Sequence, residues 1–575
     1  MSGLFLARDD SAVATARAVY ARQGFGEPTE VALPGWRLLH WPYIMGGPEL
    51  LLVDGDDVAA VAGSITVDGR TGRPALQALL RMMDDRRPDW SRLGGQFACL
   101  VRRRGRSFLF SDWFASYQVF HDADGCVLST AFLAAVEALP RVRFDAQGVY
   151  EFAFAVTALG NDTVVEEVKL LGPDAMVELT PDGVVRHPLS KPLPDRPDAQ
   201  PLPERIERHR AALDAVIGAH LDGVARVHCP LSGGLDSRLL LACLRRTPAE
   251  PLVYVYGPPG SDDVRIARAI GQAQGFPVAW TDKQAAPIDP DAFPGMVLRN
   301  FHENDALPNF GNIFDNGGNL AARDARHAGG LPVASGGAGE VFRDFFYLAD
   351  RSFTAEAVAR AFFARFVPAD ATALFDPRAF VERVRDKMLA ALERPGDRGP
   401  LPRAVVEQLY PRFRCRALFG REISLESRLS PYLMPFLGHR VVLESATLPA
   451  ALRQAGRFEA TLLHAIDPGL AAQPSAYGHD FAGPPSLGHR LSEWRTRLRP
   501  IALRQASYAI QRRLRPMGDE HGGLLDPDYL ARVIDLDYPA MRRYFRVERI
   551  ADHGVMRRVA CLEYLAARLG SRLAG

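Results

Sequence analysis

Residues 231–238 read Leu-Ser-Gly-Gly-Leu-Asp-Ser-Arg and lie between an apolar run at 225–231 and another at 237–246. The first run has the length of a buried strand, and the second suits a buried helix. The same alternation of strand-like and helix-like runs continues through 251–257, 264–275 and 277–280. We therefore predict a doubly wound α/β fold, with a parallel sheet covered by helices on both faces.

The loop between the first two runs has the residues of an anion cradle. Gly233 and Gly234 expose successive backbone N–H groups, and the helix that follows adds its N-terminal N–H groups. Ser232 and Ser237 add hydroxyl donors. Asp236 would repel a bare phosphate, so we interpret it as a ligand of Mg²⁺ that bridges the carboxylate and a pyrophosphate. The plainer interpretation is a strand–turn–helix in which Asp or Ser caps the helix.

The composition is that of an ordinary globular protein. The chain has 575 residues, of which 47% are apolar and 24% charged. Its 69 Lys and Arg residues balance 68 Asp and Glu, so no nucleic acid or anionic membrane is expected as the main partner. The start has no signal-peptide pattern and no run is long enough to span a bilayer, so we expect a cytoplasmic protein. The six cysteines lack metal or C-x-x-C spacing, which argues against a disulfide framework or structural zinc.

Two kinds of sequence divide the chain. Residues 1–185 hold short apolar or alternating runs closed by Gly, Asp or Asn, as in strands and hairpins. Residues 186–204 are rich in proline and suit an extended linker. Residues 205–575 begin with the strand–helix alternation and become mostly helical beyond about 340. We predict one domain at 1–185, a linker at 186–204 and a second domain at 205–575.

The Ser-Gly-Gly-Leu-Asp-Ser sequence at 232–237 resembles the pyrophosphate loop of the N-type ATP pyrophosphatases; it is not a Walker A loop, because the G-K-[ST] element is missing. Members of that group cut ATP between the α and β phosphates and transfer AMP to an oxygen of the substrate. Residues 335–342, Ser-Gly-Gly-Ala-Gly-Glu-Val-Phe, resemble the second nucleotide loop of the asparagine synthetases. Leu425-Glu426-Ser427-Arg428 and the stretch 435–449 resemble two later segments of the same family.

The N-terminal half fits this resemblance. Met1-Ser2-Gly3-Leu4-Phe5 is similar to the Met-Cys-Gly-Ile-Phe start of a class II glutamine amidotransferase domain, and Gly95-Gln96-Phe97-Ala98 is similar to its middle strands. Over about 1–450 the chain thus resembles the asparagine synthetase family, whose relatives include β-lactam synthetases and lasso-peptide cyclases. The resemblance implies an Ntn-hydrolase-like αββα sandwich, then a HUP-like ATP pyrophosphatase domain with a helical C-terminal portion.

The resemblance also implies a site for ATP and Mg²⁺. Asp236 and Glu340 would be the catalytic residues and the metal ligands. The adenine would lie near Val255 and Tyr256. The phosphates would lie against the two loops, on Leu231, Ser232, Gly233, Gly234, Asp236, Ser237, Ser335 and Gly336.

Three departures from the family pattern matter for function. Ser2 stands where the glutamine-using members have their cysteine nucleophile, and the Asn-Gly-Glu stretch that holds glutamine is absent, so we predict an inactive glutaminase-like domain. Gly339 falls near the usual metal-binding aspartate, which leaves Glu340 as the one carboxylate of that loop. The region 471–485 lacks the family's late lysine. Arg457 or Arg490 could supply its charge but not its proton transfer, and Tyr477 and His479 are nearby candidates.

The predicted function is an ATP-dependent amide-forming ligase of the asparagine synthetase type. A small-molecule or peptide carboxylate would become an acyl-adenylate, and ammonia or an amine would then displace AMP, without glutamine hydrolysis. The first alternative is a ring-closing ligase of the β-lactam synthetase or lasso cyclase type, and the second is a nucleotide-binding pseudo-enzyme. The carboxylate, the amine and the assembly, including a homodimer, stay open.

Overall fold

The N-terminal part begins with an antiparallel sheet. The structure is a computed structural model that describes residues 2–363, 366–514 and 525–574. In this part of the chain, six strands form a first sheet in which every neighbouring pair is antiparallel. In spatial order they are β10 (Val168–Leu170), β8 (Phe120–Asp122), β9 (Val127–Ser129), β1 (Gly3–Ala7), β3 (Trp36–Trp41) and β2 (Thr29–Leu33).

A second antiparallel sheet packs against the first. Its strands, in spatial order, are β12 (Gly183–Pro188), β11 (Ala175–Thr180), β7 (Arg106–Ser111), β6 (Leu93–Arg103), β5 (Asp57–Val67) and β4 (Leu51–Asp54). Alternation along β5 decides the layering. Val58 and Ala60 join the core shared with the first sheet, whereas Ala59 and Val61 join a separate core on the outer face. Both faces of this sheet are therefore buried.

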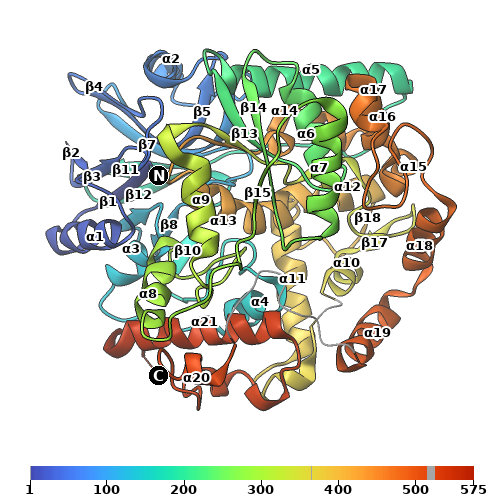
Figure 1. The fold of residues 1–575 in the computed structure, drawn as a ribbon. Coiled ribbons are helices and arrows are strands. Elements are labelled where there is room, and N and C mark those ends of the chain that lie inside the picture. The colour runs from blue at the N-terminus through green and yellow to red at the C-terminus, as the bar shows by residue number, and fades with distance from the viewer. Residues whose placement is uncertain (1, 364–365, 515–524, 575) are drawn as a thin grey trace.

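Helices cover the outer faces of the two sheets. On the first sheet, α1 (Asp10–Arg22) contacts β1, and α3 (Phe132–Glu137) contacts β8 and β9. On the second sheet, α2 (Gly72–Met82) contacts β4, β5 and β6. Asp9 accepts from two N–H groups of the first turn of α1 and so caps it. The order helix, sheet, sheet, helix is the αββα layering that the resemblance implies for this part (Figure 1).

The chain between the two parts is extended but not detached. β12 continues to Pro188, and α5 (Leu202–Leu221) begins fourteen residues later. Within this stretch Lys191 and Leu193 are buried. Lys191 Nζ lies 4.1 Å from the centre of the Trp90 ring and donates to the Asp112 carbonyl oxygen at 3.1 Å. The proline-rich segment thus packs on the N-terminal part.

A parallel sheet follows, as the alternation predicted. Its five strands in spatial order are β15 (Ala279–Thr281), β14 (Glu250–Tyr256), β13 (Arg226–Pro230), β16 (Val333–Ala334) and β19 (Tyr432–Leu433). Every neighbouring pair is parallel. The helices α6 (Asp236–Leu244) and α7 (Asp262–Gln274) connect the first three strands (Figure 1). The order along the chain reverses between β13 and β16, which makes this the topological switch point of the sheet.

The rest of the described chain is mainly helical. A two-stranded sheet of β17 (Phe353–Thr354) and β18 (Pro400–Leu401) interrupts it. The helices are α8 (Phe293–Glu303), α9 (Gly318–His327), α10 (Ala355–Phe362), α11 (Pro377–Ala391), α12 (Arg403–Glu407), α13 (Arg416–Glu426), α14 (His439–Ala446), α15 (Ala450–Arg453), α16 (Arg457–Ile466), α17 (Pro468–Ala471), α18 (Leu487–Leu498), α19 (Ile501–Leu514), α20 (Pro527–Leu530) and α21 (His553–Leu569). Among the described residues no helix has the length and apolarity that a membrane crossing requires.

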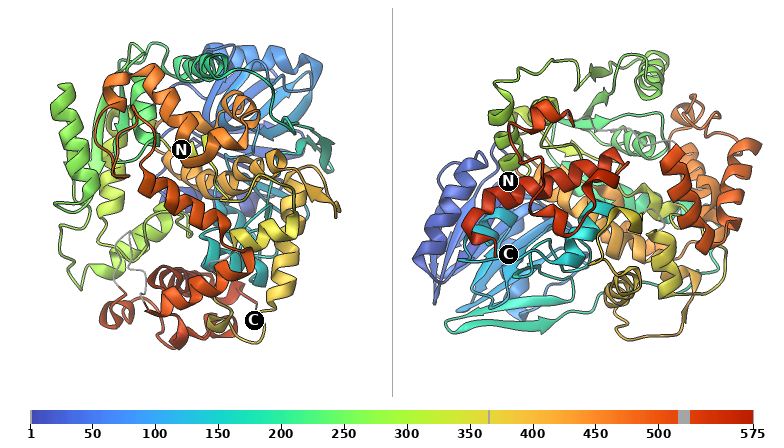
Figure 2. Two further views of the ribbon diagram at one scale, coloured as in Figure 1. Left: turned by 90° about the vertical axis from the view of Figure 1, so that its right-hand side faces the viewer. Right: turned by 90° about the horizontal axis from the view of Figure 1, so that it is seen from below.

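The last helix returns to the N-terminal part. α21 contacts α4 (Ala146–Ala155), and Figures 1 and 2 show it running across one end of the molecule beside that helix. Arg558 Nε donates to the carbonyl oxygen of Ala153 at 2.8 Å. The C-terminal segment therefore also packs on the N-terminal part.

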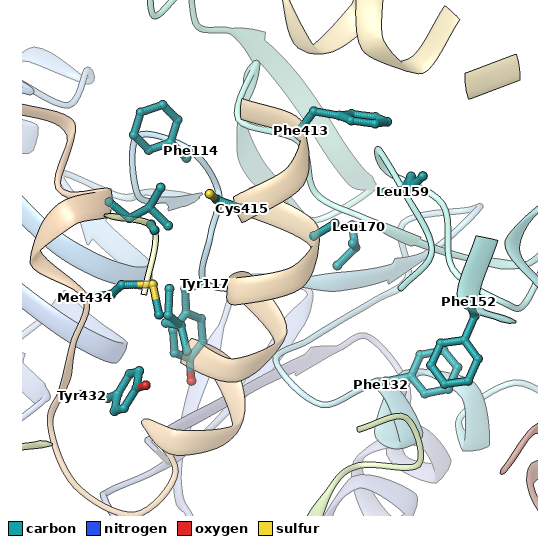
Figure 3. Packing of buried hydrophobic residues seen from close by; sticks show 14 of the residues in the cluster. Phe114, Tyr117, Phe132, Phe152, Leu159, Leu170, Phe413, Cys415, Tyr432 and Met434 are labelled. Carbon is teal, nitrogen blue, oxygen red and sulfur yellow. The ribbon is translucent and has the colours of Figure 1, made fainter. Parts of the chain in front are cut away.

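One apolar core joins the two parts. Figure 3 shows Tyr117 and Phe114 of the N-terminal part in the same cluster as Tyr432 of β19 and Met434, which directly follows that strand. Polar contacts cross the same junction, since Gln96 Nε2 donates to the Met434 carbonyl oxygen at 3.3 Å. The parallel sheet is thus held directly against the sandwich.

Candidate functional site

Two glycine-containing loops meet at the switch point of the parallel sheet. The loop 231–235 leaves the carboxyl end of β13, and the loop 335–338 leaves the carboxyl end of β16, its neighbour. A Cβ added at Gly336 would lie 3.1 Å from the backbone of Asp236 and Ser237, and one at Gly339 would overlap the side chain of Asp236. The two predicted nucleotide loops are therefore in contact. This edge of an open parallel sheet is where ligands bind in such folds.

Side-chain hydrogen bonds shape the first loop. Ser237 Oγ accepts from the Ser232 backbone N–H at 3.0 Å, and Ser232 Oγ accepts from the Gly234 N–H at 3.2 Å. Asp263, in the first turn of α7, accepts from the Gly233 N–H at 2.7 Å. Leu231 and Leu235 are buried beneath the loop. The predicted serines thus hold the loop in shape, and the amide donors of Ser232, Gly233 and Gly234 all have partners within the protein.

Asp236 does not stand alone at the start of α6. Arg343 Nη2 donates to both of its carboxylate oxygens, at 2.5 and 2.6 Å. Arg343 follows the short helical turn Gly339–Phe342 of the second loop, and its Nη1 donates to the Tyr477 hydroxyl at 3.4 Å. Burial raises the pKa of Asp236, and the charge of Arg343 opposes that rise.

Two further carboxylates surround the same guanidinium. Glu459 of α16 is fully buried, with Oε2 3.1 Å from Arg343 Nε. Burial and the neighbouring Asp236 raise the pKa of Glu459 well above its usual range. Glu340 Oε1 lies 3.6 Å from Arg343 Nη2, and its other oxygen accepts from the buried Tyr410 hydroxyl. Asp236 and Glu340 thus lie against the same arginine, Arg343.

These residues do not fit a resident magnesium ion. Mg²⁺ needs several open hard oxygens in octahedral geometry. Both Asp236 oxygens are held by Arg343, and one Glu340 oxygen is held by Tyr410. No group of three or more His, Cys, Asp or Glu side chains in the part of the chain that the structure describes is arranged to hold a metal. Magnesium is left as a prediction for the nucleotide, which brings its own counter-ion.

The predicted adenine residues point to opposite faces of β14. Val255 is buried in the core, whereas the Tyr256 hydroxyl donates to the Ala322 carbonyl oxygen of α9 at 3.2 Å. Tyr256 lines a cavity of about 910 Å³, and Lys283 Nζ lies 4.0 Å from the centre of its ring. Tyr256 can therefore offer an aromatic face to a ligand, and Val255 can offer only backbone.

A cavity of about 570 Å³ opens beside the second loop, and Leu235, Glu340 and Arg343 lie on its wall. Tyr477 and His479 also line this cavity, whereas Arg457 and Arg490 are exposed outside it. Further cavity residues come from α10, α18 and α19 and from residues 154–156 of the N-terminal part. The lining is rich in aromatic and basic side chains, which include Phe154, Phe345, Phe346, Phe362, Phe363, Phe366, Arg414, Phe481, His489, Arg499, Arg504 and Tyr508.

Sequence reasoning missed Arg343, Glu459 and Tyr410. Arg343 directly follows the stretch 335–342 that was singled out, so a charge next to a predicted phosphate loop was the available signal. Glu459 and Tyr410 come from helical segments far along the chain with no pattern of their own. Only the tertiary fold places them here.

Ser2, which stands at the position of the nucleophile in the resembling glutaminase domains, is closed off from solvent. Ser2 is fully buried, and its Oγ accepts from the Gly63 N–H at 2.7 Å. The Tyr117 hydroxyl donates to the Ser2 carbonyl oxygen at 3.0 Å. Gly63 has φ +93°, and a side chain there would overlap the Gln96 backbone and the Tyr117 ring. In this conformation the Ser2 side chain thus links the start of β1 to β5.

Comparisons with known proteins give little beyond this geometry. No protein-family model and no curated protein matches the chain. Among solved structures, glutamine phosphoribosylpyrophosphate amidotransferase from B. subtilis, complexed with ADP and GMP, is 11% identical; the match covers 48% of this chain and 90% of that one, with a TM-score of 0.24. A structure described as the allosteric regulatory enzyme of purine biosynthesis is 12% identical over 48% and 64%, with a TM-score of 0.20. These TM-scores are too low to support an argument, so the fold is judged from its own strands.

Proposed function

We propose that this chain is an ATP-dependent, amide-forming ligase of the asparagine synthetase type that works without hydrolysing glutamine. A substrate carboxylate would attack the α-phosphate of ATP to give an acyl-adenylate and pyrophosphate. Ammonia or an amine would then attack the acyl carbon and release AMP, so that one C–N bond replaces one C–O bond. ATP, with the magnesium it carries, and a carboxylate–amine pair are the proposed ligands.

The observation that supports this most is the meeting of the two loops at the switch point. The N-terminus of α6, with its partial positive charge, faces the place where the two loops meet. Ser232 and Ser237 hold the first loop in shape, and Arg343 supplies a fixed positive charge beside it. Preorganised donors and charge of this kind stabilise a leaving pyrophosphate.

The neighbouring cavity favours a substrate larger than aspartate. A volume of about 570 Å³ is in the range of pockets for ligands of drug size. Its aromatic and arginine side chains suit a bulky molecule that has an apolar body and an anionic end. This cavity supports the ring-closing alternative, in which the amine lies on the same molecule as the carboxylate.

The first test is release of AMP and pyrophosphate by the purified protein. ATP would be supplied with L-aspartate and ammonium, then with glutamine in place of ammonium, then with peptide carboxylates. In any assay that gives turnover, the Asp236→Asn variant is expected to lower the rate about a hundredfold or more, because the Asp236–Arg343 pair loses its charge balance. Asp262→Asn is the matched control, since its side chain is 75% exposed on α7.

Each outcome has a distinct meaning. Turnover with aspartate and ammonium alone supports the asparagine-type ligase. AMP formation only with a larger carboxylate that bears its own amine supports the ring-closing ligase. ATP binding, measured by calorimetry, with no AMP from any of these substrates would indicate the nucleotide-binding pseudo-enzyme. Equal rates for Asp236→Asn and the wild type would contradict the proposed site.

A further inference from the structure

Arg343 lies inside a cage of carboxylates at the nucleotide loops. Its guanidinium contacts Asp236 through two short hydrogen bonds, Glu459 at 3.1 Å and Glu340 at 3.6 Å. These three acids come from α6, α16 and the second loop. Only 19% of the Arg343 side chain is exposed, on the wall of the 570 Å³ cavity. A buried charge in this position is retained only when opposite charges surround it.

Arg343 is the cation that these carboxylates share. Asp236 and Glu459 both lie against its guanidinium, so each of them has the same counter-charge. Glu340 is held by the Tyr410 hydroxyl. Burial opposes the charge on Arg343, but Asp236 and Glu459 raise its pKa well above the usual value, so the guanidinium stays charged. The arginine thus does the electrostatic work of a bound cation.

Glycine at position 339 is part of the same arrangement. A Cβ on Gly339 would overlap Cγ and Oδ1 of Asp236. No residue with a side chain fits there while Asp236 keeps its present place. Position 339 therefore cannot present a carboxylate beside Asp236, and an oxygen ligand that Mg²⁺ would need is missing from this side of the cage.

We infer that Arg343 takes the place of a protein-bound divalent cation. The positive charge beside the two loops then comes from a side chain of the protein and not from a bound metal ion. The role in catalysis rests on the proposed function, but the inference about the cage does not. Arginine keeps its charge at all working pH values, and its planar fork matches a carboxylate. Asp236 consequently has a counter-charge before any nucleotide arrives, and metal enters the site only with the nucleotide.

The test is Mn²⁺ binding without nucleotide, because Mn²⁺ takes magnesium sites and its free form is counted by electron paramagnetic resonance. The wild type is expected to bind no Mn²⁺ at the cage. Arg343→Ala removes the cation and leaves the carboxylates together, so Mn²⁺ affinity is expected to tighten by about tenfold or more relative to the wild type. Arg343→Lys keeps a charge in the cage and is expected to behave as the wild type.

Arg497→Ala is the matched control. Arg497 also bridges two acids, with Nε 3.2 Å from Asp344 and Nη2 3.5 Å from Glu493, but Asp344 keeps a second arginine, Arg403, at 2.5 Å. The Arg497→Ala variant should therefore show no gain in Mn²⁺ affinity over the wild type. Stoichiometric Mn²⁺ binding by the wild type, or no gain in folded Arg343→Ala, would overturn the inference. If Arg343→Ala unfolds, as thermal melting would show, Arg343→Gln replaces it, and the same gain is required.

These results are separate from the ligase assay. A wild type that excludes Mn²⁺ yet forms no AMP would contradict the proposed function and keep the inference. If the wild type forms AMP but also binds Mn²⁺ without nucleotide, the proposed function is supported and the inference about Arg343 is contradicted. The two proposals can therefore fail independently.

Discussion

Replacing Asp305 by Ala should destabilise the whole protein, because this buried acid joins its two parts. Asp305 precedes α9, and its side chain has no exposed surface. Its oxygens accept from the N–H groups of Phe132 and Leu133 at 2.7 and 2.9 Å, which caps α3 of the N-terminal sandwich. The same carboxylate lies 3.1 Å from Arg421 and 3.2 Å from Arg428, both buried.

The expected cost follows from what Asp305→Ala leaves behind. Two buried guanidinium groups lose their counter-charge, and breaking a buried pair of this kind costs about 3–5 kcal/mol. The lost cap of α3 belongs to the same network as the two ion pairs, so the cost of the cap is not added to theirs. We expect the free energy of unfolding to fall by about 4 kcal/mol in total. In a cooperative unit of 575 residues that corresponds to a fall in the melting temperature of roughly 3 °C.

The assay is thermal and urea unfolding of the wild type, Asp305→Ala, Asp305→Asn and Asp262→Ala. Asp305→Asn keeps the shape but not the charge, so its loss should lie between those of the wild type and Asp305→Ala. Asp262 pairs with Arg265 on the surface, and its removal should change the unfolding free energy by less than about 0.5 kcal/mol. A loss below about 1 kcal/mol for Asp305→Ala, or one equal to that of Asp262→Ala, would refute the reasoning.

Three further predictions concern the linker, the N-terminal site and the cavity. Burial lowers the pKa of Lys191 to about 7 from an ordinary 10.5, so between those values the unfolded state binds more protons and stability rises with pH. The stability advantage of Lys191→Met over the wild type in urea unfolding should therefore shrink by about 2 kcal/mol from pH 7 to pH 9; a constant gap contradicts this. Ser2 is fully buried, so neither the wild type nor Ser2→Cys should release glutamate from glutamine, and glutamate production by either would show an open glutaminase site. Ala361→Trp on the cavity wall should block AMP formation with a bulky carboxylate while calorimetry shows unchanged ATP binding; loss of both, or of neither, places the substrate elsewhere.

Local patterns predicted the elements of the parallel sheet that have regular length. The runs at 225–231, 237–246 and 251–257 became β13, α6 and β14, because apolar periodicity is a property of neighbouring residues. The strands β16 and β19 have only two residues each, too few for any periodic signal. Their place in the sheet depends on pairing with strands far along the chain.

Short-range chain geometry accounts for the strand–loop–helix unit at 225–246, the sandwich strands and the glycines of both loops, so local patterns could predict them. The surroundings of Asp236 depend instead on long-range packing. Arg343 and Glu459 reach it from segments more than a hundred residues later, and the same long-range packing seats α21 on α4 and closes Ser2 behind Tyr117. Charge pairing between distant segments leaves no trace in a local pattern, because it depends on which backbones the apolar core brings together.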